Sequence, residues 1–149
     1  MLIGVPGSGK TTWVLKNHPT LCYASTDKYI EQFAAEAGKT YNDVFESTIK
    51  IATSRMLDDV SEFLCDYADF VWDQTNTTKK SRATKIARLV KEDYQIIGIV
   101  FGIPKDLKER LASRPGKNIP SHVMTSMITN FEIPIIAEGF SKIIMAENE

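Results

Sequence analysis

The chain has 149 residues, of which 43% are hydrophobic, and its formal net charge is −1. This length fits one domain that can bury a core without disulfide or metal support, and the near-neutral charge by itself predicts no partner. The longest apolar run, residues 96–103, is shorter than the roughly twenty residues that span a bilayer, so we expect no membrane association. Cys22 and Cys65 lack a C-x-x-C spacing, which predicts buried thiols in a reducing cytoplasm, and the two histidines show no metal-ligand spacing.

The first element in chain order is an apolar segment, residues 2–5, that we expect to be a strand. It runs into G-V-P-G-S-G-K-T at residues 4–11, which fits the phosphate-loop pattern G-x-x-x-x-G-K-[ST] at every position. A plain glycine-rich turn is the alternative, but a helical pattern over residues 10–17 supplies the expected context. Lys10 can reach the β- and γ-phosphates of ATP, and the Thr11 hydroxyl can ligate Mg²⁺. The loop predicts these nucleotide-binding residues: Gly4, Pro6, Gly7, Ser8, Gly9, Lys10, Thr11 and Thr12.

Strand-like and helical segments alternate along the rest of the chain, with no repeat or linker between them. Further strands are expected at residues 20–25, 69–73, 94–101 and 142–146. Helices are expected at residues 28–37, 42–68, 78–92, 105–113 and 121–130. This order predicts a single α/β domain over residues 1–149, with a central, mostly parallel five-stranded sheet and helices on both faces.

Ligands of parallel sheets bind at the carboxyl ends of the strands, so the residues that follow each strand are the candidate site. Asp27 follows the second strand. An ionised carboxylate there can take the proton of a hydroxyl that attacks the γ-phosphate. The same residue types fit a helix N-cap, with Thr26 or Asp27 opening the next helix, and spacing alone favours the cap.

Asp73 ends the third strand, and Q-T-N follows it in the sequence. It can organise Mg²⁺ through water or contact the acceptor. The alternative is a turn, because the residues after it are turn formers and Thr77 or Thr78 can cap the following helix.

Basic residues concentrate in residues 79–117, which hold eleven of the eighteen Lys and Arg but only four of the nineteen Asp and Glu. A basic stretch is usually a solvated face, and we expect the helix at residues 78–92 to turn its basic side chains outward. The stretch could also contact phosphates or a nucleic-acid backbone.

Arg110 and Arg114 are four residues apart, so we expect them to share one helix face before R-P-G-K ends the helix. Arginines on such a mobile basic lid stabilise charge on a phosphoryl group during transfer. A solvated helix paired internally with Asp106 or Glu109 is an equal alternative.

These motifs, in this order, resemble those of the bacteriophage 5′-hydroxyl polynucleotide kinases and their small relatives, within the zeta-toxin and polynucleotide kinase-like group of AAA-domain P-loop kinases. The likeness covers most of the chain. Its motifs are G-V-P-G-S-G-K-T-T-W, S-T-D-K-Y, D-Q-T-N, K-K-S-R, K-E-R-L-A-S-R-P-G-K-N-I-P, F-E-I-P and E-G-F-S-K-I-I.

The resemblance implies a three-layer P-loop kinase fold with a basic helical lid at about residues 105–118. It implies ATP-dependent, Mg²⁺-dependent phosphorylation of a 5′-hydroxyl end of DNA or RNA, in the cytoplasm of the host cell if the protein is phage-encoded. Asp27 is then the general base rather than a cap, and Arg114 is the lid arginine on the donor phosphates, supported by Arg110 and Lys117. The acceptor side is implied to hold Asp73, Thr75, Asn76, Ile119 and Pro120, with Asp73 also near the metal.

Three departures from the family pattern concern the acceptor. Ile30 stands where the family often has an arginine that contacts the phosphate of the acceptor, and Lys28 is the nearest substitute. D-Q-T-N is one residue longer than the shortest family form, and the chain ends at Glu149, so we expect no phosphatase domain. A different hydroxyl acceptor, such as a hydroxymethylated base or a small metabolite, therefore stays open. A nucleotide-binding ATPase without an acceptor and assembly into a homo-oligomer also stay open.

Overall fold

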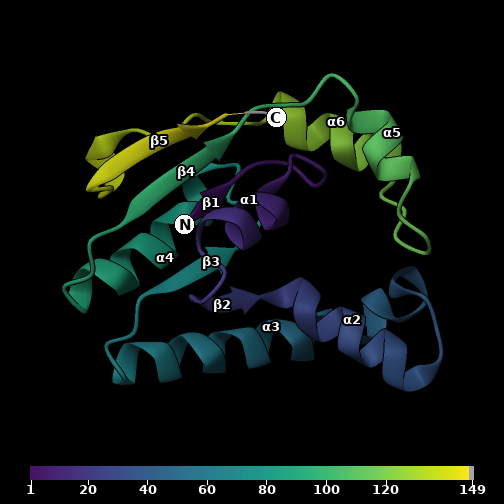
Figure 1. The fold of residues 1–149 in the computed structure, drawn as a ribbon, viewed down its shortest axis with the longest axis horizontal. Helices are drawn as coiled ribbons and strands as arrows, with labels where there is room; N and C mark the ends of the chain where they lie inside the picture. Colours follow the sequence, from purple (N-terminus) through teal and green to yellow (C-terminus); the bar gives the residue numbers. More distant parts are fainter. Residues whose placement is uncertain (148–149) are drawn as a thin grey trace.

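The computed structural model describes residues 1–147 and shows an alternating α/β fold (Figure 1). The strands are β1 (Leu2–Ile3), β2 (Cys22–Ser25), β3 (Phe70–Asp73), β4 (Ile97–Phe101) and β5 (Lys142–Ala146). The helices are α1 (Lys10–Asn17), α2 (Thr26–Ala37), α3 (Tyr41–Cys65), α4 (Lys79–Lys91), α5 (Leu107–Ala112) and α6 (Ser121–Thr129), with a short 3₁₀ helix η1 (Ile136–Glu138). The expected elements are present, and most of their ends lie within two or three residues of the expected positions.

All strand pairs are parallel, but the strands hydrogen-bond as three plus two rather than as one ladder of five. One sheet has the order β1-β4-β5 and the other pairs β2 with β3. The two sheets join where β1 lies beside the end of β3. The backbone N–H of Gly4 donates to the carbonyl of Thr75 at 2.9 Å, and the side-chain amide of Asn76 donates to the carbonyl of Leu2 at 2.7 Å. Because β1 has only two residues, a side chain completes this junction in place of a longer ladder.

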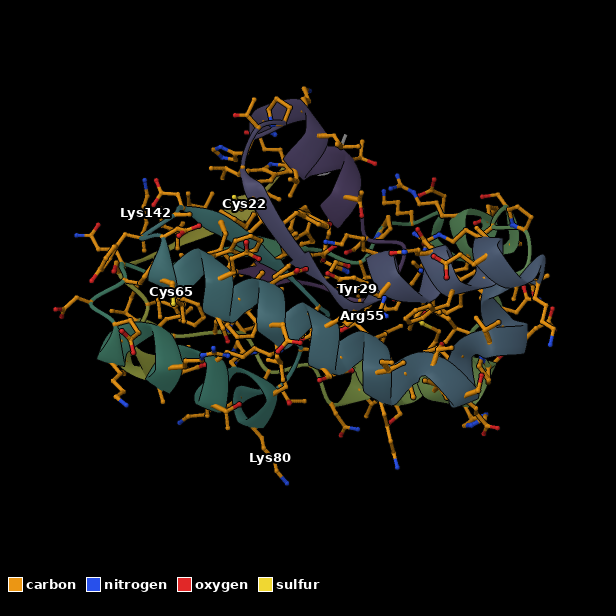
Figure 2. All side chains as sticks on the ribbon, turned by 90° about the horizontal axis from the view of Figure 1, so that it is seen from below. Cys22, Tyr29, Arg55, Cys65, Lys80 and Lys142 are labelled. Atoms are coloured by element: carbon orange, nitrogen blue, oxygen red, sulfur yellow. The ribbon has the colours of Figure 1, made fainter. Side chains whose placement is uncertain are left out.

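Helices cover both faces of the strands, as the alternating pattern predicted. Successive strand residues point to opposite faces, so Leu2 packs on the side of Val14 of α1 while Ile3 packs on the side of Met56 of α3. Seen from below, α1 lies on one side of the strands and α4 on the other (Figure 2). The structure thus has the expected α/β architecture of a P-loop kinase.

The basic side chains of α4 do not all point outward, which corrects the sequence-based expectation. Lys80 projects away from the molecule (Figure 2). Arg82, in contrast, is 0% exposed and forms a two-pronged ion pair with Glu138, with N–O distances of 2.8 and 2.9 Å. Its remaining nitrogen, Nη1, donates to the carbonyls of both Asn76 and Glu132 at 2.9 Å. A guanidinium can be buried in this way because its donors are satisfied, and here it ties α4 to the segment before β5.

The helix that carries Asp27 is fastened to α3 by polar contacts on its outer side. Asp59 of α3 accepts hydrogen bonds from Tyr29 at 2.7 Å and from Lys28 at 3.0 Å. The guanidinium of Arg55 lies 5.9 Å from the ring centre of Tyr29, and Figure 2 shows these two side chains together where the helices meet. These contacts hold α2, the helix that carries Asp27, against α3.

The exposure of the two cysteines differs from the expectation from composition. Cys22 is half-buried and Cys65, at the end of α3, is exposed, so the prediction of two buried thiols is wrong (Figure 2). Within residues 1–147, every helix is too short or too polar to cross a bilayer.

Candidate active site

A cleft of 1690 Å³ lies at the carboxyl ends of β1, β2 and β3. The phosphate loop forms one wall, and the starts of α2 and α3 form the opposite wall. The segment after α5, residues 113–118, descends toward the α2–α3 turn, where Figure 1 shows the two chain segments next to each other. The cleft thus brings together all three regions that the sequence singled out.

The loop wall has the backbone shape that its glycines allow. Gly7 and Gly9 have φ values of +85° and +96°, a left-handed conformation that other residues rarely adopt. Lys10 does not extend freely into solvent, because its ammonium donates to the carbonyls of Gly4 at 2.9 Å and Val5 at 3.0 Å. Partial burial lowers the pKa of Lys10 in spite of the nearby carboxylates. A bound phosphate group would stabilise the charged form of this ammonium.

Two loop residues face inward rather than into the cleft. Gly4 is buried, and a Cβ there would come within 2.7 Å of the Ser8 hydroxyl and 2.9 Å of Phe101, so close packing requires this glycine. The Ser8 hydroxyl is itself buried without a hydrogen-bond partner among the described residues. Gly4 and Ser8 therefore do not line this cleft, although Ser8 lines a smaller hollow beside it. The other predicted loop residues do line the cleft: Pro6, Gly7, Gly9, Lys10, Thr11 and Thr12.

Asp73 and Thr11 meet beside the loop through a tyrosine. The phenol of Tyr23 donates to the Asp73 carboxylate and also bonds the Thr11 side chain. Burial raises the pKa of Asp73, although the hydrogen bond from Tyr23 and the charge of Lys10 oppose this. A nearby cation would stabilise the ionised form of this carboxylate.

This oxygen-donor set fits Mg²⁺. No group of three or more His, Cys, Asp or Glu side chains within residues 1–147 could form a metal centre. Mg²⁺ in phosphoryl-transfer sites needs no such group, because it takes most of its ligands from phosphate and water. Thr11 and Asp73 are the residues that would hold it.

Asp27 lies across the cleft from the loop, and it does not cap α2. That helix begins at Thr26, its N-cap position is Ser25, and no side chain makes a capping hydrogen bond there. The Asp27 carboxylate instead accepts hydrogen bonds from Tyr41 at 2.7 Å and from Lys117 at 2.5 Å. Its side chain is 52% exposed, so the carboxylate remains accessible from the cleft.

The surroundings of Asp27 keep it ionised. Desolvation in the cleft would raise the pKa of Asp27, but the charge and hydrogen bond of Lys117, with the hydrogen bond from Tyr41, outweigh it. The pKa of Asp27 is therefore lowered. The carboxylate is therefore ionised at neutral pH and can accept a proton, and its low pKa makes it a weak base.

The two lid arginines do not share a helix face, which corrects the prediction from their spacing. Helix α5 ends at Ala112, so Arg114 lies in the segment beyond it, where it lines the cleft. Arg110 pairs with Asp106 at 2.8 Å, as the solvated-helix alternative proposed. Arg110 borders a second hollow of 430 Å³, which meets the main cleft at Gly9 and Thr12.

A set of hydrogen bonds, which we call the clasp, joins the lid segment to the start of α3. The side chain of Asn42 donates to the carbonyl of Asn118 and accepts from its N–H, both at 3.0 Å, and the backbone N–H of Asn42 donates to the carbonyl of Gly116 at 3.0 Å. Gly116 has φ +68°, and a Cβ there would come within 2.7 Å of Thr40. The clasp thus holds the segment that carries Lys117 beside Asp27.

The remaining predicted residues divide between the cleft and the core. Thr75, Ile119 and Pro120 line the cleft. Asn76 does not line it: its side chain is 1% exposed and bonds Leu2, Gln74 and Lys85. The Asn76 side chain is thus buried where it joins the two sheets, away from the cleft lining on which its predicted role beside the acceptor depends. Of the two threonines expected as possible caps, Thr78 provides the cap, because it forms a capping box with Ser81 at the start of α4.

Three site residues had no counterpart in the sequence motifs. Tyr23 and Tyr41 hold the two carboxylates, and Asn42 holds the lid. Tyr23 has a weak local signal, because it lies on the strand that leads to Asp27. Tyr41 and Asn42 have none, since they reach the site only through the packing of α3 against α2.

Comparison with known families agrees with this geometry. A family model described as "AAA domain" matches residues 1–134, which is most of the chain. The chain therefore belongs to this family of P-loop NTPase-like kinases, and the match supports nucleotide binding with kinase or ATPase activity.

Proposed function

We propose that the protein transfers the γ-phosphoryl group of ATP to the 5′-hydroxyl end of DNA or RNA. The observation that carries the proposal is the half-exposed carboxylate of Asp27, which faces the phosphate loop across one continuous cleft. A switch or motor ATPase activates water and has no need of a second organised wall. A kinase needs one, because the acceptor must be positioned as carefully as the donor.

The residues divide the chemistry between them. Lys10 and Arg114 hold and neutralise the donor phosphates while charge moves toward the leaving ADP. Asp27 accepts the proton of the hydroxyl as its oxygen bonds to the γ-phosphorus. Thr11 and Asp73 would hold Mg²⁺, which would supply charge neutralisation for the donor phosphates when bound. The second hollow beside Gly9 offers space for the nucleoside of the donor.

The size of the cleft supports a large acceptor. Small-molecule sites usually measure about 300–1,000 Å³, and this cleft of 1690 Å³ exceeds that range. It continues past Asp27 along α2 and α3, where Ala34, Ile49 and Thr53 line it. A strand end whose next nucleotides follow this extension would use the added space.

The experiment is a transfer assay with γ-labelled ATP and three acceptors: a 5′-hydroxyl oligonucleotide, the same strand with a 5′-phosphate, and a 5′-phosphorylated strand with hydroxymethylated bases. We expect label on the first only. Label on the third alone would indicate a base hydroxyl as the acceptor. Phosphate release without label on any strand would indicate an ATPase.

A further inference from the structure

Lys117 lies against the candidate base, whereas the resemblance implied that it supports the donor phosphates. Its ammonium is 2.5 Å from Asp27, 3.5 Å from Glu31 and 4.2 Å from the ring centre of Tyr41. The side chain is 16% exposed. Groups from α2 and α3 thus hold this ammonium at the acceptor end of the cleft.

The position of Lys117 is fixed from the backbone as well. The residues on either side of it, Gly116 and Asn118, make the clasp hydrogen bonds to Asn42. A lysine on an untethered loop would lose rotamer freedom on binding a ligand. Here the clasp has already ordered the backbone, so the ammonium is organised before an acceptor arrives.

The other basic side chains near Asp27 have different tasks. Position 30, where the family pattern often has an arginine, is Ile30, and it is 0% exposed in the core between α2 and α3. Lys28 also lines the cleft, but its ammonium pairs with Asp59 of α3 at 3.0 Å. Lys10 is bonded to the loop carbonyls. Of the basic residues that line the cleft within residues 1–147, Lys117 is the one in contact with Asp27.

A hydroxyl that reaches Asp27 must therefore arrive beside Lys117. An ammonium has three donors, so it can keep one hydrogen bond to Asp27 and give another to an incoming anion. The sugar at the 5′ end of a strand carries a phosphodiester next to the reacting hydroxyl, whereas an uncharged alcohol brings no such partner.

We propose that Lys117 is a specificity-determining residue that pairs with the phosphate flanking the acceptor hydroxyl, and so selects a nucleic-acid end over an uncharged alcohol. This inference rests on the proposed function. It assigns acceptor recognition to the lid segment, which lies far along the chain from the phosphate loop.

The test uses two 5′-hydroxyl oligodeoxynucleotides that differ only in the first internucleotide linkage, a phosphodiester in one and an uncharged methylphosphonate in the other. We expect the wild-type protein to prefer the charged linkage by about tenfold in kcat/KM, the value of one charge-assisted hydrogen bond. In Lys117→Ala this preference should fall to near unity, and Lys117→Arg should retain part of it. The matched control is Lys28→Ala, which removes the same charge from the cleft lining and should keep the full preference.

Several outcomes would overturn the inference. One is a wild-type protein that phosphorylates both strands equally well. Another is Lys117→Ala losing activity on both strands to the same extent with the preference intact, since Lys117 would then act only by positioning Asp27. ATP affinity and the circular dichroism spectrum of each variant verify folding. If the wild-type protein labels neither strand, the proposed function fails first, and this inference falls with it.

Discussion

The donor and acceptor halves of the cleft are built from the chain in different ways. In the donor half, Lys10 bonds the carbonyl of Gly4, six positions earlier in the sequence. In the acceptor half, Lys117 bonds Asp27 across 90 positions, and Asn118 bonds Asn42 across 76. The phosphate loop of the donor half is thus a local motif that accompanies many activities, whereas the acceptor half exists only when α2, α3 and the lid have packed together. Under the proposed function, substrate choice depends on the acceptor half.

The largest effect is expected in the donor half, from Lys10→Ala. Loss of the ammonium removes charge stabilisation from the transferred phosphoryl group, so kcat should fall by about 10³-fold or more. Acceptor affinity should change little, because Lys10 belongs to the loop. Steady-state kinetics and oligonucleotide binding by fluorescence anisotropy measure the two quantities. Equal losses in both would mean that the halves are not separable.

Arg114→Ala should follow, with a loss of about 10²-fold in kcat if the side chain stabilises the moving charge. Arg110→Ala is the matched control, since Arg110 is paired with Asp106 outside the main cleft. It should retain most of its kcat and change at most the KM for ATP. A larger loss of kcat in Arg110→Ala than in Arg114→Ala would contradict these assignments of the two arginines.

The spacing that linked these arginines illustrates what a sequence can predict. The loop, the alternation of strands and helices, and Asp27 at a strand end were all predictable, because each depends on local pattern and on the rule for strand ends. The end of α5 before Arg114 was not, because a two-residue shift of a helix end is within the usual uncertainty yet decides which side chains share a face. The buried location of Asn76 was not predictable for another reason. Because β1 has only two residues, the Asn76 side chain completes the junction between the two sheets. Tyr41 and Asn42 contact residues far away in the sequence, and no pattern in a single chain encodes such pairs.

Asn42→Ala would break the clasp and so test the acceptor half of the cleft by itself. It removes two side-chain hydrogen bonds, each worth about 1 kcal/mol, at an exposed position. We expect the KM for a 5′-hydroxyl oligonucleotide to rise several-fold and the KM for ATP to stay nearly constant. A rise confined to ATP would place the function of the clasp in the donor half.

The smallest effect is expected from Tyr41→Phe, which keeps the ring beside Lys117 but removes one hydrogen bond to Asp27. The pKa of Asp27 is held low by Lys117 first and by Tyr41 to a lesser extent, so it should rise in this variant. A base loses activity as the pH falls through its pKa. The acid limb of the kcat/KM profile should therefore move to higher pH, while the activity well above the limb stays similar. An unmoved limb would mean that it reports another group.

The central claim is that Asp27 serves the acceptor hydroxyl and not the nucleotide. Its most direct test is label transfer from ATP to a 5′-hydroxyl oligonucleotide by Asp27→Asn, measured beside the affinity of the same variant for ATP. We expect transfer to fall by about 10²- to 10⁴-fold, because the amide cannot accept the proton, with ATP affinity nearly unchanged. Full transfer activity in Asp27→Asn would contradict the account, and so would a loss of ATP binding that by itself explains the fall.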